Sequence, residues 1–96
     1  MIDRVVILGA GISGVGAAIL ARKQGFIVFI SDSNPIKKKY KNILEKHQVE
    51  WEEGKHTLDK ILNASEIIVS PGIPEDSDII IDLKKYNASI ISEIEF

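Results

Sequence analysis

The chain has 96 residues, 45% of them hydrophobic, and a formal net charge of −2. This size and apolar content predict one small domain, and the slight negative charge argues against nucleic acid as a partner. The sequence contains no cysteine, which excludes disulfide bonds and thiolate metal sites. No apolar run reaches the roughly 20 residues that cross a bilayer. No signal peptide is expected, because the chain begins directly with a strand-like run.

Short apolar runs alternate with helix-like segments along the chain. The predicted strands are residues 2–8, 26–30, 49–52, 66–69 and 89–91, and the predicted helices are residues 13–23, 35–47, 58–62 and 78–86. The first run is apolar nearly throughout, which is typical of a strand covered on both faces of a parallel sheet. The alternation predicts an α/β fold, a Rossmann-like five-stranded parallel sheet with helices on both faces, in a single domain of residues 1–96.

Turn and capping residues mark the ends of several predicted elements. Gly25 follows the first helix as a C-terminal stop, and the small residues of that helix permit close packing on the sheet. Pro35 suits the first turn of the second helix, with Asn34 as its candidate N-cap. The last predicted strand is followed by no closing helix, so we expect the chain to be a fragment of a longer protein.

A G-x-G-x-x-G motif, formed by Gly9, Gly11 and Gly14, directly follows the first apolar run. In such a motif the first glycine permits a tight turn, the second lets phosphates approach the backbone, and the third lets helix and strand pack closely. The helix N-terminus then favours a diphosphate, toward which the amide and hydroxyl of Ser13 would point. The alternative is structural, since any tight turn uses glycine and Ser13 can simply cap the helix.

Two further segments lie at carboxyl ends of predicted strands, where open α/β sheets bind their ligands. Asp32 lies in the polar turn of residues 31–35 that follows the second strand, 18 residues after Gly14. In NAD-binding domains an acid at this place binds the adenosine ribose, and it disfavours NADP; the alternative is a solvated turn residue. The loop of residues 70–74, S-P-G-I-P, follows the fourth strand. It is expected either to border the same crevice or to serve as a rigid connection.

The remaining charged and polar groups are interpreted as surface features. The lysine-rich residues 37–41 lie on a predicted helix and form a solvated face. Residues 54–57, G-K-H-T, lack the earlier glycine of a P-loop. His47 and His56 are isolated in polar surroundings, without metal-ligand spacing. A surface acidic cluster is formed by Glu50, Glu52, Glu53 and Asp59. No catalytic residue and no nucleophile–base pair is predicted.

Four segments together resemble a known family. They are residues 5–14 (V-V-I-L-G-A-G-I-S-G), 31–32 (S-D), 68–74 (I-V-S-P-G-I-P) and 91–96 (I-S-E-I-E-F). Over its whole length the chain resembles the N-terminal domain of the Mur ligases, most closely the D-glutamate-adding members. The glycine motif alone is weak evidence for this, whereas the S-P-G-I-P loop and the S-E-I-E-F ending are more specific.

The resemblance implies a domain that holds the UDP part of a substrate rather than a dinucleotide. Ile12 and Ser13, together with the motif glycines Gly9, Gly11 and Gly14, match positions around the diphosphate. Asp32 and Ser33 match positions at the uracil, and Ser70, Pro71 and Gly72 match the loop that lines the uridine and sugar-diphosphate region. The chain departs from the family at Asn34, where a basic residue is frequent, so a side-chain contact to the uracil from this position is not carried over.

Further expectations concern a longer parent enzyme. The resemblance implies a bacterial, cytoplasmic, monomeric ligase of peptidoglycan precursor synthesis. That enzyme joins D-glutamate to UDP-N-acetylmuramoyl-L-alanine through an acyl phosphate, using ATP and magnesium. Because the family's central ATP-binding and C-terminal domains are absent here, we expect this chain to bind UDP without catalysing, and with no cofactor or metal of its own. The alternatives are an NAD-binding domain of a dehydrogenase, another Mur ligase, or a regulatory module that binds no nucleotide.

Overall fold

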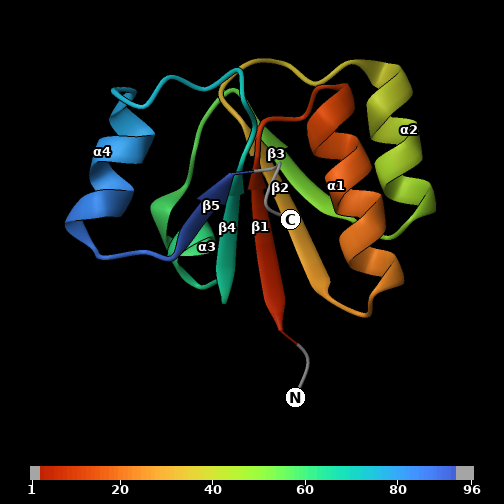
Figure 1. The fold of residues 1–96 in the computed structure, drawn as a ribbon. Coiled ribbons are helices and arrows are strands. Elements are labelled where there is room, and N and C mark those ends of the chain that lie inside the picture. Colours follow the sequence, from red (N-terminus) through yellow and green to blue (C-terminus); the bar gives the residue numbers. More distant parts are fainter. Residues whose placement is uncertain (1–2, 93–96) are drawn as a thin grey trace.

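The structure is a computed structural model that describes residues 3–92. Strands and helices alternate along these residues (Figure 1). The strands are β1 (Arg4–Leu8), β2 (Ile27–Asp32), β3 (Glu50–Glu53), β4 (Glu66–Val69) and β5 (Ile90–Ser92). The helices are α1 (Ile12–Lys23), α2 (Lys38–Lys46), α3 (Leu58–Leu62) and α4 (Asp78–Lys85). Within the described part of the chain, no helix has the length and apolar character needed to cross a membrane.

The strands form one parallel sheet with the order β3-β2-β1-β4-β5. β1 lies at the centre, where Ile7 is opposite Ile30 of β2 and Ile68 of β4. The chain extends the sheet from β1 through β2 to β3 and then crosses back to place β4 on the other side of β1. The predicted five-stranded parallel sheet is confirmed. The reversal of strand order between β1 and β4 marks the place where open α/β sheets bind ligands.

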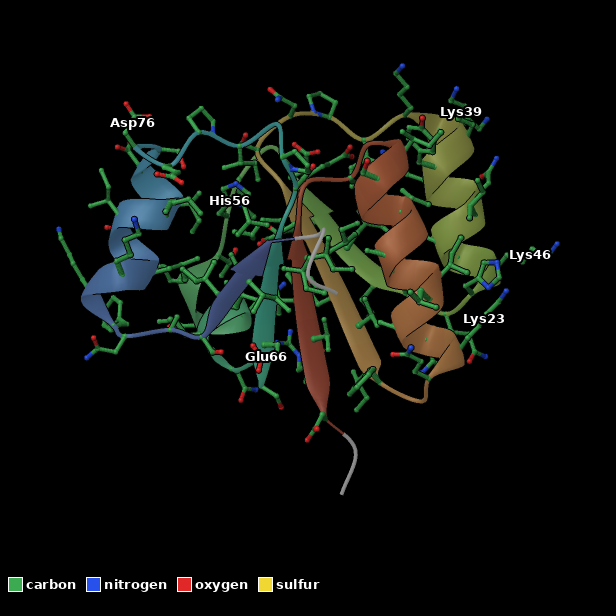
Figure 2. All side chains as sticks on the ribbon, in the orientation of Figure 1. Lys23, Lys39, Lys46, His56, Glu66 and Asp76 are labelled. Carbon is green, nitrogen blue, oxygen red and sulfur yellow. The ribbon has the colours of Figure 1, made fainter. Side chains whose placement is uncertain are left out.

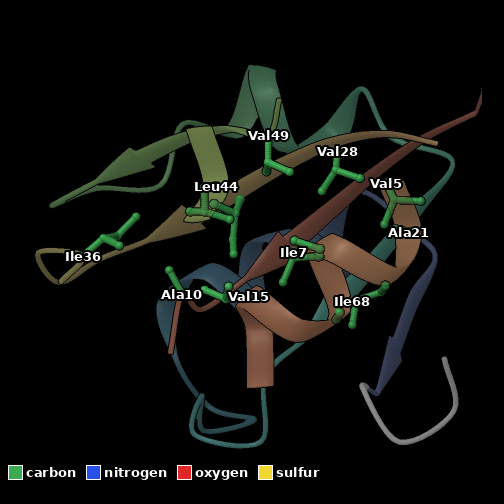
Figure 3. Close-up of a cluster of buried hydrophobic side chains, with 13 residues drawn as sticks. Val5, Ile7, Ala10, Val15, Ala21, Val28, Ile36, Leu44, Val49 and Ile68 are labelled. Atoms are coloured by element: carbon green, nitrogen blue, oxygen red, sulfur yellow. The ribbon is translucent and has the colours of Figure 1, made fainter. Parts of the chain in front are cut away.

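Helices cover both faces of the sheet, as predicted: α1 and α2 lie on one face, and α3 and α4 on the other (Figure 1). On the first face, Val5 and Ile7 of β1 share a buried cluster with Val15 of α1 and Leu44 of α2 (Figure 3). The cluster on the second face contains Val6, Leu8, Phe29, Ile61, Ile67, Ile79, Ile80 and Leu83. Alternate residues of β1 therefore contribute to two cores, which explains why the strand is apolar from Val5 to Leu8.

Helix α1 packs closely on the sheet through small residues, as the sequence predicts. Ala18 and Ala21 are fully buried. The helix ends at Lys23 with Gln24 as its C-cap; Gly25 follows with a φ of +93° and donates its backbone N–H to the carbonyl oxygen of Arg22 at 3.0 Å. The N–H of Phe26 then bonds to the carbonyl oxygen of Ala21 at 3.1 Å. This left-handed C-terminal turn directs the chain straight into β2.

Helix α2 begins at Lys38 rather than at the predicted Pro35. Asn34 does not cap this helix, because Lys37 occupies the N-cap position in an extended conformation. Ile36 is only 5% exposed and belongs to the cluster beneath α1. The side chain of Ile36 enters the core directly before the extended N-cap residue Lys37, so the helix starts only after this insertion.

Strand β2 is longer than predicted, because Ser31 and Asp32 belong to it rather than to a turn. Ser31 lies opposite Leu8 of β1 and Glu52 of β3, so the strand continues with partners on both sides. The predicted bounds of the third helix and the fourth strand are confirmed, and most others shift by one residue. Ile2 and the predicted S-E-I-E-F ending beyond its first residue lie outside the described residues.

Candidate functional site

The predicted glycine motif forms the turn between β1 and α1. Gly9 has a φ of +104°, which side chains rarely adopt, and a Cβ there would lie 2.7 Å from the Cβ of Ser70. A Cβ on Gly14 would overlap the carbonyl oxygen of Gly9 and lie 2.9 Å from its carbonyl carbon. These contacts confirm the tight turn and the close helix packing that the sequence assigned to the first and third glycines. They also bring the loop after β1 against the loop after β4.

The N-terminus of α1 is open at Gly11. Gly11 is the N-cap residue, no side chain caps the helix, and a Cβ built there has no atom within 4 Å. The first helical hydrogen bond runs from the N–H of Val15 to the carbonyl oxygen of Gly11 at 3.0 Å. The N–H groups of Ile12, Ser13 and Gly14 therefore precede the hydrogen-bonded ladder, at the positive end of the helix dipole. The alternative that Ser13 caps the helix is wrong.

A cavity of about 560 Å³ opens at the carboxyl ends of the strands, between the loops that follow β1 and β4. Small-molecule sites commonly have volumes of about 300–1,000 Å³, so a nucleotide-sized ligand fits this space. Predicted site residues that line the cavity are Gly9, Gly11, Asp32, Ser33, Ser70 and Gly72. The topology thus brings together residues from three separate stretches of the chain.

The other predicted site residues lie outside the cavity wall. Ile12, with 78% of its surface exposed, and Ser13 lie on the exposed first turn of α1. Gly14 is buried beneath the turn, where its role is to let the helix pack. Pro71 lines a neighbouring cavity of about 420 Å³ beside β5 instead.

Asp32 ties the end of β2 to the glycine turn. Its Oδ2 accepts a hydrogen bond from the N–H of Ala10 at 2.8 Å, and its Oδ1 accepts one from the N–H of Asn34 at 2.9 Å. The alternative of a freely solvated turn aspartate is therefore wrong. A carboxylate offers about four acceptor positions, so Asp32 can hold the turn and still accept a hydrogen bond from a ligand in the cavity.

Ser77, which the sequence did not single out, supplies an unsatisfied polar atom at the cavity. It immediately precedes α4 as the N-cap residue, but its hydroxyl makes no capping bond. Its Oγ is buried and has no hydrogen-bond partner among the described residues. Because buried polar atoms are normally paired, this oxygen at the cavity wall lacks the partner that such an atom usually has.

A buried polar network that the sequence did not predict lies beside the cavity, at the ends of β2 and β3. The Oγ of fully buried Ser31 lies 2.8 Å from Oε2 of Glu52 and 2.7 Å from Nδ1 of His56. Glu52 also accepts hydrogen bonds from the N–H of Thr57 at 2.8 Å and from its hydroxyl at 2.6 Å. The surface interpretation of Glu52 is wrong, since this residue is only 7% exposed. His56 is likewise not isolated.

Strand register explains this network. Ser31 and Glu52 are direct neighbours in the parallel ladder of β2 and β3. Gly54, with a φ of +76°, turns the chain after β3 and lets His56 return to the Ser31 hydroxyl. The available sequence signal was that Glu52 falls inside a predicted strand of a sheet covered on both faces. An acid at such a position needs buried hydrogen-bond donors.

The network also sets the charges of its two titratable groups. Burial by itself would raise the pKa of Glu52, but hydrogen bonds from Thr57 and Ser31 hold that pKa below its usual value. Burial lowers the pKa of His56, against the opposing influence of the Glu52 and Asp32 carboxylates. Above pH 7, Glu52 is therefore an anion and the imidazole of His56 is neutral.

The rest of the predicted acidic cluster divides between structural and exposed residues. Glu53 accepts a hydrogen bond from the N–H of Ile36 at 2.7 Å and pairs with Lys41 at 2.6 Å, which joins β3 to the start of α2. Lys41, which was predicted to lie on a solvated face, therefore also forms a structural ion pair. Glu50 and Asp59 are exposed, as expected.

Comparisons with known proteins agree with this geometry. The family model described as the MurD N-terminal domain matches residues 4–79. A relative from Bacteroides thetaiotaomicron, named UDP-N-acetylmuramoylalanine--D-glutamate ligase, is 57% identical over 93 residues, which are 97% of this chain and 21% of the relative. A relative of the same name from Bacteroides fragilis is 54% identical over 93 residues, with the same shares of the two chains. The chain thus spans about a fifth of the length of the curated relatives it matches.

A solved structure supports the fold. The UDP-N-acetylmuramate:L-alanyl-gamma-D-glutamyl-meso-diaminopimelate ligase from Neisseria meningitides superposes with a TM-score of 0.85 at 21% identity. The match covers 97% of this chain and 29% of that ligase. Together with the family model, which spans most of the sequence, these findings confirm the resemblance seen in the sequence: the chain belongs to the MurD N-terminal domain family.

Proposed function

We propose that this chain binds the UDP moiety of UDP-N-acetylmuramoyl-L-alanine, as the N-terminal domain of an ATP-dependent D-glutamate ligase. The observation that carries the proposal is the open N-terminus of α1 at the cavity. Gly11 lines the cavity, and no atom lies within 4 Å of its Cβ position. Backbone N–H groups at a helix N-terminus bind phosphates well, and the 57% identical relative carries the name of this ligase.

The proposed binding mode assigns each part of the ligand to one loop. The diphosphate lies against Gly11, where the N–H groups of Ile12 and Ser13 are within reach of its oxygens. The uracil lies toward the end of β2, beside Asp32 and Ser33, which line the same cavity. The loop after β4 covers the uridine and sugar-diphosphate region through Ser70 and Gly72, which line the cavity, while Pro71 between them faces the neighbouring cavity and shapes the loop. Phosphate binding in this mode relies on backbone N–H groups and the helix dipole at the uncapped N-terminus of α1.

The catalytic machinery is proposed to belong to the remainder of a longer parent protein. In this proposal the central and C-terminal domains bind ATP, magnesium and D-glutamate and form the amide bond through an acyl phosphate. The enzyme is a cytoplasmic monomer of peptidoglycan precursor synthesis. The 96-residue chain alone then binds the nucleotide without ligase activity. Amide formation by the purified chain, with ATP, magnesium and D-glutamate present, would contradict this division.

A titration of isotope-labelled chain by NMR tests the binding. UDP is expected to shift the amide signals of Ile12, Ser13, Asp32 and Gly72, whereas NAD is expected to leave them unchanged. Shifts with NAD alone would instead support a dehydrogenase domain. If none of UDP, NAD and UDP-N-acetylmuramoyl-L-alanine shifts any amide signal, the result would support a module that binds no nucleotide.

Two matched variants test the phosphate position. Gly11→Leu places a side chain in the open space at the helix N-terminus and is expected to weaken UDP binding about tenfold or more, since charge-assisted hydrogen bonds are worth about 1.5–3 kcal/mol. Gly16→Leu is the control, because Gly16 lies on the same helix, outside the cavity, and also has open space around its Cβ position. Isothermal titration calorimetry gives both affinities. Equal UDP affinity in the Gly11 variant and the control would refute the assignment.

A further inference from the structure

The hydrogen-bond network behind the cavity fixes the proton on His56. Glu52 is a carboxylate and can only accept, so the 2.8 Å contact between Ser31 Oγ and Glu52 Oε2 requires the hydroxyl hydrogen of Ser31. The second acceptor near that hydroxyl, the carbonyl oxygen of Lys55 at 3.3 Å, also cannot donate. The Ser31 hydroxyl has only one hydrogen, and it points toward these acceptors. The 2.7 Å contact with Nδ1 of His56 must therefore be donated by the imidazole.

This assignment determines what His56 presents to a ligand. With the hydrogen on Nδ1, the neutral imidazole carries a lone pair on Nε2. Nε2 has no hydrogen-bond partner among the described residues, and His56 lines the cavity that also contains Gly11 and Asp32. Figure 2 shows the His56 side chain near the carboxyl ends of the strands, on the side of the sheet that carries α4. The cavity wall therefore includes a histidine held as a hydrogen-bond acceptor.

We propose that His56 reads the base of the bound nucleotide by accepting a hydrogen bond on Nε2, and that it thereby selects uracil over cytosine. The inference rests on the proposed function, which puts a uridine nucleotide in this cavity. Uracil carries an N–H donor at N3 between its two carbonyl groups, whereas N3 of cytosine is an acceptor. An acceptor that faces another acceptor loses the hydrogen bond and leaves both groups unpaired, which costs about 1–3 kcal/mol.

Ser31 and Glu52 act through His56 in this proposal and are positioning residues. Glu52 orients the Ser31 hydroxyl, and Ser31 in turn holds the imidazole in the tautomer that leaves Nε2 free to accept. Thr57 anchors Glu52 through two hydrogen bonds of its own. The carboxylate therefore stays in place when Ser31 is altered, which makes Ser31→Ala a usable variant.

The first test compares UDP with CDP by isothermal titration calorimetry at pH 8, since the two ligands carry the same diphosphate. The wild-type chain is expected to prefer UDP about tenfold. His56→Ala should lower the UDP affinity about five- to tenfold, leave CDP nearly unchanged and remove most of the preference. His47→Gln is the matched control, because His47 lies at the end of α2, away from this cavity. It should behave as the wild type.

The second test reads the tautomer directly from the imidazole nitrogen signals in long-range ¹H–¹⁵N NMR spectra. The hydrogen is expected on Nδ1 of His56 in the wild type, and Ser31→Ala is expected to lose this fixed tautomer and part of the preference for UDP. A wild-type hydrogen on Nε2, or an unchanged UDP preference in a folded His56→Ala variant, would overturn the inference while leaving UDP binding intact. Absence of any UDP binding by the wild type would refute the proposed function, and this inference with it.

Discussion

Replacing Gly14 with alanine is expected to destabilise the fold, although alanine is the better helix former. The new Cβ would overlap the carbonyl oxygen of Gly9 and lie 2.9 Å from its carbonyl carbon, inside the 3.4–4 Å of ordinary contacts. Both partners are backbone atoms, so either α1 moves off the sheet or the turn distorts. Overpacking of this kind costs about 1–3 kcal/mol, a large share of the roughly 5–15 kcal/mol that stabilises a typical domain.

Thermal unfolding followed by circular dichroism measures this cost. A loss of 1 kcal/mol lowers the Tm of a domain of this size by about 4–8 °C. Gly16→Ala is the matched control, because Gly16 lies in the same helix but has no atom within 4 Å of its Cβ position. That variant should gain about 0.5–1 kcal/mol from reduced backbone entropy in the unfolded chain. A Gly14→Ala protein with a Tm equal to or above that of the wild type would refute the close-packing argument.

Two further predictions concern the cavity wall. Asp32→Asn leaves one acceptor oxygen for the N–H groups of Ala10 and Asn34, so urea denaturation should show a loss of about 1–3 kcal/mol; an unchanged midpoint would contradict this role. Lowering the pH should also destabilise the fold: the folded-state pKa values of His56 and Glu52 lie below their unfolded values, so the unfolded chain binds more protons. The Tm should fall as the pH drops below the 6.5 of unfolded histidine, and again below the 4.5 of unfolded glutamate. His56→Gln should remove the first step only, and a Tm that rises on acidification would refute the assignment.

The sequence determined the features of this protein that depend on neighbouring residues. The apolar run of β1 and the spacing of Gly9, Gly11 and Gly14 predicted the turn, the close helix packing and the α/β sheet, because each is a local pattern with a local steric cause. Of the two alternatives left open for the S-P-G-I-P loop, the structure favours the one in which it borders the crevice, since Ser70 and Gly72 line the cavity. Parallel strands place their carboxyl ends at one edge, so this followed from strand order along the chain.

Tertiary structure alone decided which polar residues are buried and what they contact. Glu52 and His56 look like surface residues in the sequence, but buried Glu52 and half-buried His56 become partners of Ser31 because β2 and β3 align in a particular register. Ile36 shows the same dependence, since its insertion into the core delays the start of α2. Register and side-chain burial depend on contacts between residues 21 to 25 positions apart, such as those of the Ser31 network. Such contacts cannot be predicted from a short stretch of sequence. Which donors and acceptors line the cavity is therefore decided only by the register of the assembled sheet.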